Sequence, residues 1–126
     1  MKFKLFTLLA VAASVVLIPT SLLAHHGQAG YNIKEAVTVS GMVTEFRFLN
    51  PHCIVEFDVK DDKGQVEKWQ GELTSPNHLI RAGWTATSLK AGDQVTITGF
   101  RAKSGAPSLW ITKILLNGTE IPLREE

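Results

Sequence analysis

The chain has 126 residues, of which 44% are hydrophobic and 20% are charged, and its formal net charge is +1. This near-neutral charge argues against binding to a nucleic-acid backbone, which needs clustered lysine and arginine side chains. The sequence contains a single cysteine, Cys53, so no disulfide can form within one chain. We expect this lone thiol to be buried in the core of a single domain.

The first 24 residues have the order of regions found in a secretory signal peptide. A basic start with Lys2 and Lys4 is followed by an apolar run over residues 5–18, the helix breaker Pro19 and the small residue Ala24 at the expected cleavage site. The alternative is an uncleaved membrane anchor, but the run is shorter than the about 20 residues that a spanning helix needs. We therefore expect cleavage, a periplasmic or secreted location in a bacterium, and no membrane span in the mature protein.

Residues 25–35 are polar and show no periodicity, so we expect an extended N-terminal arm there and a β domain over residues 36–126. Valines occupy one face of the first expected strand and phenylalanines occupy the other face further along. This change of face predicts a β-bulge near Gly41. The alternating residues are Val37, Val39, Val43, Phe46 and Phe48.

Residues 52–60 have the most regular strand pattern of the chain, after a turn predicted at Asn50-Pro51. Strict alternation predicts that one face of this strand lies in the core and the other lies at or near solvent. The expected core face carries Cys53, Val55, Phe57 and Val59, and the opposite face carries His52, Ile54, Glu56 and Asp58. The loop at residues 61–64 then predicts a hairpin to a third strand at residues 66–73.

A short helix is expected after this strand, because Ser75 is a suitable N-cap and Pro76 suits the first helical position. Gly83 is expected to end the helix. Alternating apolar residues predict a fourth strand near residues 95–99 and a fifth over residues 109–116. Asn117-Gly118 predicts a tight turn, followed by a short closing strand at residues 121–123.

Three strands, a short helix and two or three further strands form the order of the small barrel known as the oligonucleotide/oligosaccharide-binding (OB) fold. We therefore predict a mainly β protein, with a five- to six-stranded OB-like barrel and one short helix between strands three and four. A β-sandwich with a similar number of strands is the competing architecture.

A series of short motifs runs through the whole mature chain. The chain resembles, over these motifs, a family of small exported bacterial proteins of unknown function, the domain-of-unknown-function family six-one-five-two. This resemblance supports export and a compact β domain, but it implies no activity. The motifs are His25-His26, Asn50-Pro51-His52, Trp69 with Glu72, Pro76-Asn77, Leu79, Arg81-Ala82-Gly83-Trp84, Leu89-Lys90, Gly92-Asp93-Gln94-Val95-Thr96 and Gly99-Phe100-Arg101-Ala102-Lys103 with Gly105.

The adjacent histidines His25 and His26 follow the expected cleavage site directly. After cleavage, the free α-amine and the imidazole of His25 can chelate one metal ion. Imidazole nitrogens suit Cu(II) well, so copper is the expected metal, ahead of zinc or nickel. His52 lies on the solvent side of its strand, where the arm can reach it, and Glu72 is a further ligand or the partner of one. The predicted metal site is therefore His25, His26, His52 and Glu72.

The same residues have plainer interpretations. The histidine pair can be a solvated arm, and His52 can hydrogen-bond the backbone of its own turn. His78 is expected on the surface of the helix, and Glu72 can form a structural ion pair with Arg81.

The three tryptophans, Trp69, Trp84 and Trp110, are candidates for lining a ligand groove on the barrel. The alternative function is therefore a non-enzymatic binding module for a small molecule, a glycan or an exported protein partner. No Ser/His/Asp set, phosphate-binding glycine loop or dinucleotide motif occurs at a usable spacing. An enzyme is thus less favoured than a binding protein.

Overall fold

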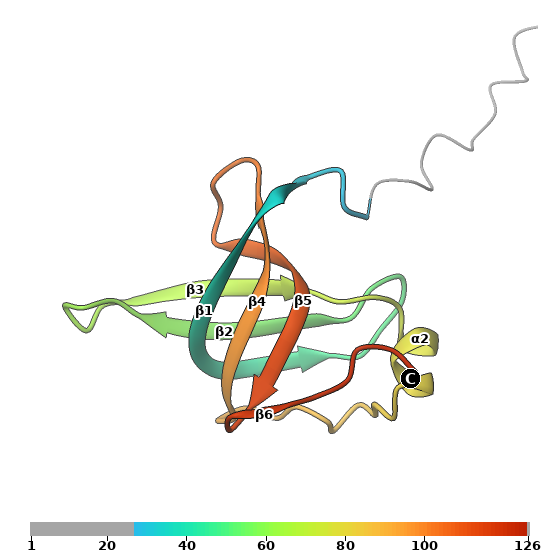
Figure 1. Ribbon diagram of the computed structural model, residues 1–126. Coiled ribbons are helices and arrows are strands. Elements are labelled where there is room, and N and C mark those ends of the chain that lie inside the picture. Colours follow the sequence, from blue (N-terminus) through green and yellow to red (C-terminus); the bar gives the residue numbers. More distant parts are fainter. Residues whose placement is uncertain (1–26, 126) are drawn as a thin grey trace, which may run out of the picture.

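The computed structural model describes residues 27–125, so the predicted signal peptide and the pair His25 and His26 lie outside the described residues. Figure 1 shows a curled sheet with a short helix beside it. The elements are β1 (Tyr31–Arg47), β2 (Ile54–Lys60), β3 (Val66–Glu72), α2 (Pro76–Arg81), β4 (Gln94–Ala102), β5 (Ser108–Leu116) and β6 (Thr119–Glu120).

The sheet closes on itself. Its strand order is β3-β2-β1-β4-β5-β6, and β3 pairs in parallel with β5 as well as with its neighbour β2. Strand β1 is long enough to pair with β4 through its first part and with β2 through its last part. The result is the OB-like barrel with one short helix between strands three and four that the sequence predicted, and the competing sandwich of two separate sheets is wrong.

The first strand differs from the expectation in two respects. It begins at Tyr31, five residues before the predicted start of the β domain, because this residue already pairs with Ala102 of β4. Its register shift relative to β2 lies between Val43 and Glu45 rather than at Gly41. Gly41 serves a different purpose, since a Cβ atom there would lie 2.4 Å from the carbonyl oxygen of Asp58 on β2. The strands approach too closely at this point for any side chain.

The core follows the alternation that begins just before β2, since Cys53 and the β2 residues Val55 and Phe57 are fully buried as predicted. Helix α2 begins at Pro76 as predicted, although Ser75 makes no side-chain hydrogen bond to it. Leu79 is the fully buried residue of this helix and joins the same core cluster. Among residues 27–125, no helix is long and apolar enough to cross a membrane.

The C-terminal segment departs from the prediction. Asn117 and Gly118 both have positive φ angles, 50° and 82°, which confirms the tight turn. The strand after it is β6 at Thr119–Glu120, so the strand expected at residues 121–123 is wrong. Ile121 donates one more backbone hydrogen bond to Ile114, and the ladder stops at Pro122 because proline has no N–H to donate.

Candidate functional site

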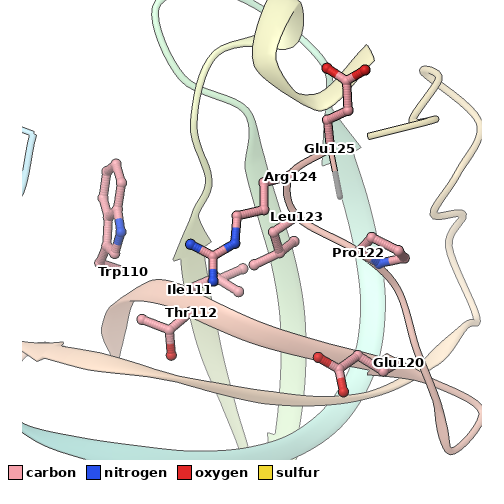
Figure 2. Close-up of a pocket in the computed structure, with 8 residues that line it drawn as sticks. All are labelled: Trp110, Ile111, Thr112, Glu120, Pro122, Leu123, Arg124 and Glu125. Carbon is pink, nitrogen blue, oxygen red and sulfur yellow. The ribbon is translucent and has the colours of Figure 1, made fainter. Parts of the chain in front are cut away.

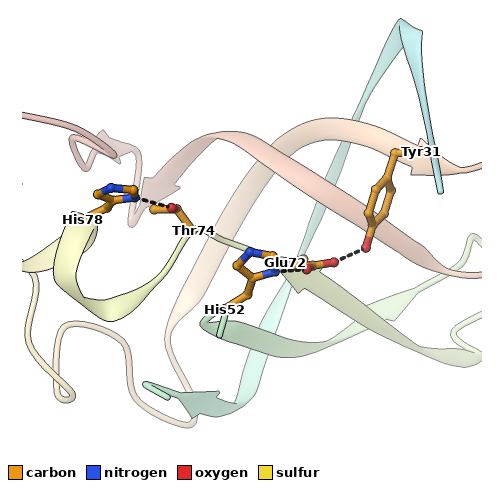
Figure 3. A network of polar contacts seen from close by, with 5 residues as sticks. All are labelled: Tyr31, His52, Glu72, Thr74 and His78. Carbon is orange, nitrogen blue, oxygen red and sulfur yellow. Dashed lines mark hydrogen bonds and ion pairs between the residues drawn. The ribbon is translucent and has the colours of Figure 1, made fainter. Parts of the chain in front are cut away.

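His52 and Glu72 meet on the outer face of the barrel. His52 lies two residues before β2, and Glu72 is the last residue of β3, where it pairs with Ile54. The ring atom Nδ1 of His52 lies 2.5 Å from Oε1 of Glu72 (Figure 3). Adjacent strands of a hairpin therefore bring together two of the four predicted site residues.

Tyr31 hydrogen-bonds to the other oxygen of the same carboxylate. Its hydroxyl donates a hydrogen bond of 2.6 Å to Oε2 of Glu72. Burial, reinforced by this hydrogen bond to Glu72, raises the pKa of Tyr31 from 10.0 to about 12. Tyr31 is therefore a proton donor at ordinary pH, and Glu72 accepts hydrogen bonds through both oxygens.

This arrangement defines the state of the imidazole. An ionised carboxylate can only accept hydrogen bonds, so Nδ1 of His52 carries the proton of the contact with Glu72. In the neutral ring, Nε2 is then the unprotonated nitrogen and carries the free lone pair. Among residues 27–125 no hydrogen-bond partner of Nε2 is found, and the His52 side chain is 31% exposed.

Trp110 and Gly27 flank the imidazole. The Trp110 ring, on the strand that pairs in parallel with β3, meets His52 edge-on with a centroid distance of 5.5 Å and an interplanar angle of 86°. A Cβ atom built on Gly27 would lie 3.6 Å from Cε1 of His52 and 3.9 Å from the Trp110 ring. Gly27 thus lies beside both rings.

The predicted ligand set is only partly visible, since His25 and His26 lie outside the described residues. Within residues 27–125, no group of three or more His, Cys, Asp or Glu side chains could hold a metal ion by itself. Sequence reasoning missed Tyr31, the only tyrosine of the chain. Its partner Glu72 is 41 residues away, and no local pattern signals such a contact.

The expected ion pair between Glu72 and Arg81 is not formed. Arg81 is exposed at the end of α2, whereas Glu72 points to the opposite side, toward His52 and Tyr31. The two residues are separated by residues 73–75 and by the length of α2. His78 is an exposed residue of α2 as expected, with Nδ1 2.9 Å from the hydroxyl of Thr74.

Two other residues considered beside His52 have structural roles. Cys53 faces the core and is fully buried, as predicted, and this burial raises the pKa of its thiol. Glu56 shares the outer face with His52 but forms an ion pair with Arg47, at 2.6 Å between Nη2 and Oε1. Neither residue adds a ligand to His52.

The three tryptophans do not line one groove. Trp84 is buried and donates from Nε1 to the carbonyl of Pro122 at 2.6 Å, while Trp69 is buried and donates to Glu67 at the same distance. Trp110 is half-buried and is the one that borders the predicted site.

A pocket of about 540 Å³ is lined in part by Trp110 (Figure 2). It lies between β5 and the C-terminal segment, with Ile111 and Leu123 as its apolar wall and the guanidinium of Arg124 directed into it. Glu120 and Glu125 also line it, so the pocket carries charges of both signs.

The sequence matches the model of one protein family. The sequence model of DUF6152, described as a family of unknown function, matches residues 12–109. No curated protein gives a significant sequence match to the chain.

Two solved structures share part of the fold. One is the N-terminal domain of PriB protein from Thermoanaerobacter tencongensis, which is described as dimeric. It has a TM-score of 0.45 and 17% sequence identity, and the match covers 66% of this chain and 96% of that one. The other is Rim1, a mitochondrial single-stranded DNA binding protein from S. cerevisiae, with a TM-score of 0.45 and 14% identity, covering 73% of this chain and 97% of that one. At these values neither similarity bears on what the present chain binds.

Proposed function

Because the chain belongs to DUF6152, a family of unknown function, we propose its function from its own site: it binds a metal ion, copper in the first place, through His52 and the histidines at positions 25 and 26. In this proposal the protein is exported and binds the ion after the signal peptide has been removed. The role that we propose for such a site is storage or delivery of the metal.

The observation that carries the proposal is the position of Gly27. A Cβ atom built there would lie 3.6 Å from Cε1 of His52, the ring carbon between the two imidazole nitrogens. Positions 26 and 25 are joined to Gly27 by one and two peptide links, and consecutive Cα atoms are about 3.8 Å apart. The proposed ligands at positions 25 and 26 are thus the chain neighbours of a residue that lies beside the imidazole.

The chemistry of the described residues supports a nitrogen-ligated ion. His52 offers Nε2 while Glu72 holds Nδ1, which is the usual arrangement of a histidine that binds a metal. Imidazole suits copper, zinc and nickel, and among these the divalent copper ion binds a given nitrogen site most strongly. An amino-terminal histidine adds a chelating amine, which also favours copper.

A titration with Cu(II) tests the proposal. The protein is produced by export so that the cell processes its N-terminus, and mass spectrometry identifies its first residue. We expect one equivalent of Cu(II) to bind, with visible absorption and an electron spin resonance spectrum typical of nitrogen ligands. His52→Ala and His25→Ala should each weaken binding by at least about 10-fold, since each removes a ligand.

His78→Ala is the matched control, because His78 is exposed on α2 and, among the described residues, its side chain hydrogen-bonds only to Thr74. It should bind Cu(II) like the wild type. Protein with an extended or tagged N-terminus should bind more weakly. Equal affinity of wild type and His52→Ala would refute the proposal.

The pocket beside Trp110 favours a second candidate function, a binding module for a small molecule. Its walls combine an aromatic ring, an apolar floor and side chains of both charges, Arg124 against Glu120 and Glu125. A small zwitterion such as an amino acid matches these charges better than a simple anion does. Arg124→Gln separates the two functions, because it changes this pocket and leaves His52 untouched.

A further inference from the structure

We infer that Tyr31, acting through Glu72, is a positioning residue that presents Nε2 of His52 to the metal, and that Glu72 is not itself a ligand. This inference rests on the proposed function and narrows the metals that the site accepts. It draws only on Gly27, Tyr31, His52, Glu72 and Trp110, all of which are within the described part of the chain.

The first step concerns the carboxylate. Oε1 of Glu72 accepts from Nδ1 of His52 at 2.5 Å, and Oε2 accepts from the Tyr31 hydroxyl at 2.6 Å. Hydrogen bonds of this kind to an ionised carboxylate are among the stronger ones in proteins. A metal bound by Glu72 would compete with these two donors for the negative charge of the same two oxygens, and we infer that the carboxylate orients the imidazole instead.

The second step concerns the imidazole. With Nδ1–H donated to Glu72, Nε2 of the neutral ring is the nitrogen with an available lone pair. Trp110 packs against the ring edge-on, and a Cβ atom built on Gly27 would lie 3.6 Å from Cε1, so these neighbours restrict the rotation that would exchange the two ring nitrogens. The contacts therefore select one tautomer and one orientation before any metal arrives.

The third step explains why the hydroxyl of Tyr31 matters. A glutamate at the end of a strand has several rotamers, and a single contact with His52 leaves the carboxylate able to turn. Tyr31, which comes from the first strand, fixes the second oxygen and thereby fixes the plane of the carboxylate. The tyrosine ring also packs on Trp110 at 6.2 Å between centroids, a contact that a phenylalanine would retain.

The consequence is selectivity between classes of metal. Calcium and magnesium require several oxygen ligands, and the one carboxylate in contact with His52 already accepts a hydrogen bond on each oxygen. Copper, zinc and nickel accept imidazole nitrogen readily. The site is thus built for the nitrogen-preferring ions and against the oxygen-preferring ones.

A double-mutant cycle on Cu(II) affinity tests the positioning role. Glu72→Ala should weaken Cu(II) binding by about 10- to 100-fold, the usual effect of losing a residue that orients a ligand, and by clearly less than His52→Ala, which removes the ligand itself. Tyr31→Phe removes only the hydroxyl and should weaken binding several-fold. If Tyr31 acts through Glu72, the double variant should bind no more weakly than Glu72→Ala alone.

Glu45→Ala is the matched control, because Glu45 is an exposed carboxylate on β1, and it should bind Cu(II) normally. Additive effects of Tyr31→Phe and Glu72→Ala would overturn the inference. So would a loss in Glu72→Ala as complete as in His52→Ala, since Glu72 would then be a ligand. Binding of Ca(II) as tight as that of Cu(II) would overturn the proposed selectivity.

Nitrogen-15 NMR of the metal-free protein gives an independent reading. At a pH where His52 is neutral, its proton should reside on Nδ1 in the wild type and shift toward Nε2 in Glu72→Ala. Mixed tautomers in a protein that binds Cu(II) would refute this inference alone. A proton held on Nδ1 in a protein that binds no Cu(II) would refute the proposed function and, with it, the role of Nε2 as a ligand.

Discussion

Glu72 is the residue at which separate parts of the chain meet. It receives hydrogen bonds from Tyr31 at the start of β1 and from His52 before β2, while its own strand neighbour Trp110 packs on His52. The carboxylate of Glu72 thus links β1, β3 and the segment before β2 on the outer face. Its two contacts give the imidazole a defined tautomer, which a solvated histidine does not have.

The Tyr31 hydroxyl makes the stability of the protein sensitive to alkaline pH. Burial raises its pKa in the folded state to about 12, against 10.0 for an unperturbed tyrosine. A raised folded pKa means that the unfolded chain ionises first, so the stabilisation is complete below pH 10 and is lost as the pH rises through about 12. Between these values the free energy of unfolding should fall more steeply for the wild type than for Tyr31→Phe.

Urea denaturation of both proteins at pH 8, 10 and 11 measures this difference. The groups that titrate in both proteins cancel in the comparison. Parallel curves for wild type and variant would show that the hydroxyl is not held in the way the structure describes.

The pairing of strands β4 and β5 depends on a glycine, Gly99, at a point where the two backbones approach each other closely. Their register shifts between Thr98 and Gly99, where Gly99 pairs with Ile111. A Cβ atom on Gly99 would lie 2.1 Å from the carbonyl oxygen of Trp110, and this backbone cannot move aside without opening the ladder. The glycine is therefore required for the close approach of the two strands.

Gly99→Ala should lower the free energy of unfolding by about 1–3 kcal/mol, as expected for overpacking in a rigid region. Gly30→Ala is the matched control, because a Cβ atom there would meet nothing within 4 Å. It should leave stability almost unchanged. Chemical denaturation of both variants checks the prediction, and equal stability of the two would contradict it.

The barrel as a whole is closed by contacts between distant segments. The parallel pairing of β3 with β5 joins the two ends of the curled sheet, and α2 lies beside the barrel with Leu79 in the shared core (Figure 1). Trp84 then fixes the C-terminal segment through its hydrogen bond to Pro122. Closure places Trp110 next to Glu72 and so completes the wall of the predicted site.

Leu79→Ala should therefore destabilise the whole molecule, by about 2–5 kcal/mol. Leu79 is 0% exposed, while its neighbour Ile80 on the same helix is 54% exposed. Ile80→Ala should change stability by less than about 0.5 kcal/mol, as is usual for surface substitutions. Thermal or urea unfolding distinguishes the two variants, and similar losses would show that α2 does not pack as described.

The amino-acid sequence alone determined the strand pattern, the position of the helix, the burial of Cys53 and the outward direction of His52. These features follow from local alternation and turn chemistry, which act over a few residues. It also led to an OB-like barrel, because the order of elements along the chain restricts how they can pair. The family resemblance is confirmed by the match over residues 12–109.

Only the tertiary structure decided which side chains surround His52. The sequence suggested Arg81 as the partner of Glu72, but the barrel places Tyr31 there, 41 residues away, and brings Trp110 and Gly27 to the same imidazole. Such neighbours depend on the register between strands and on the closure of the sheet. Both are set by the packing of the entire core, which no short stretch of sequence encodes.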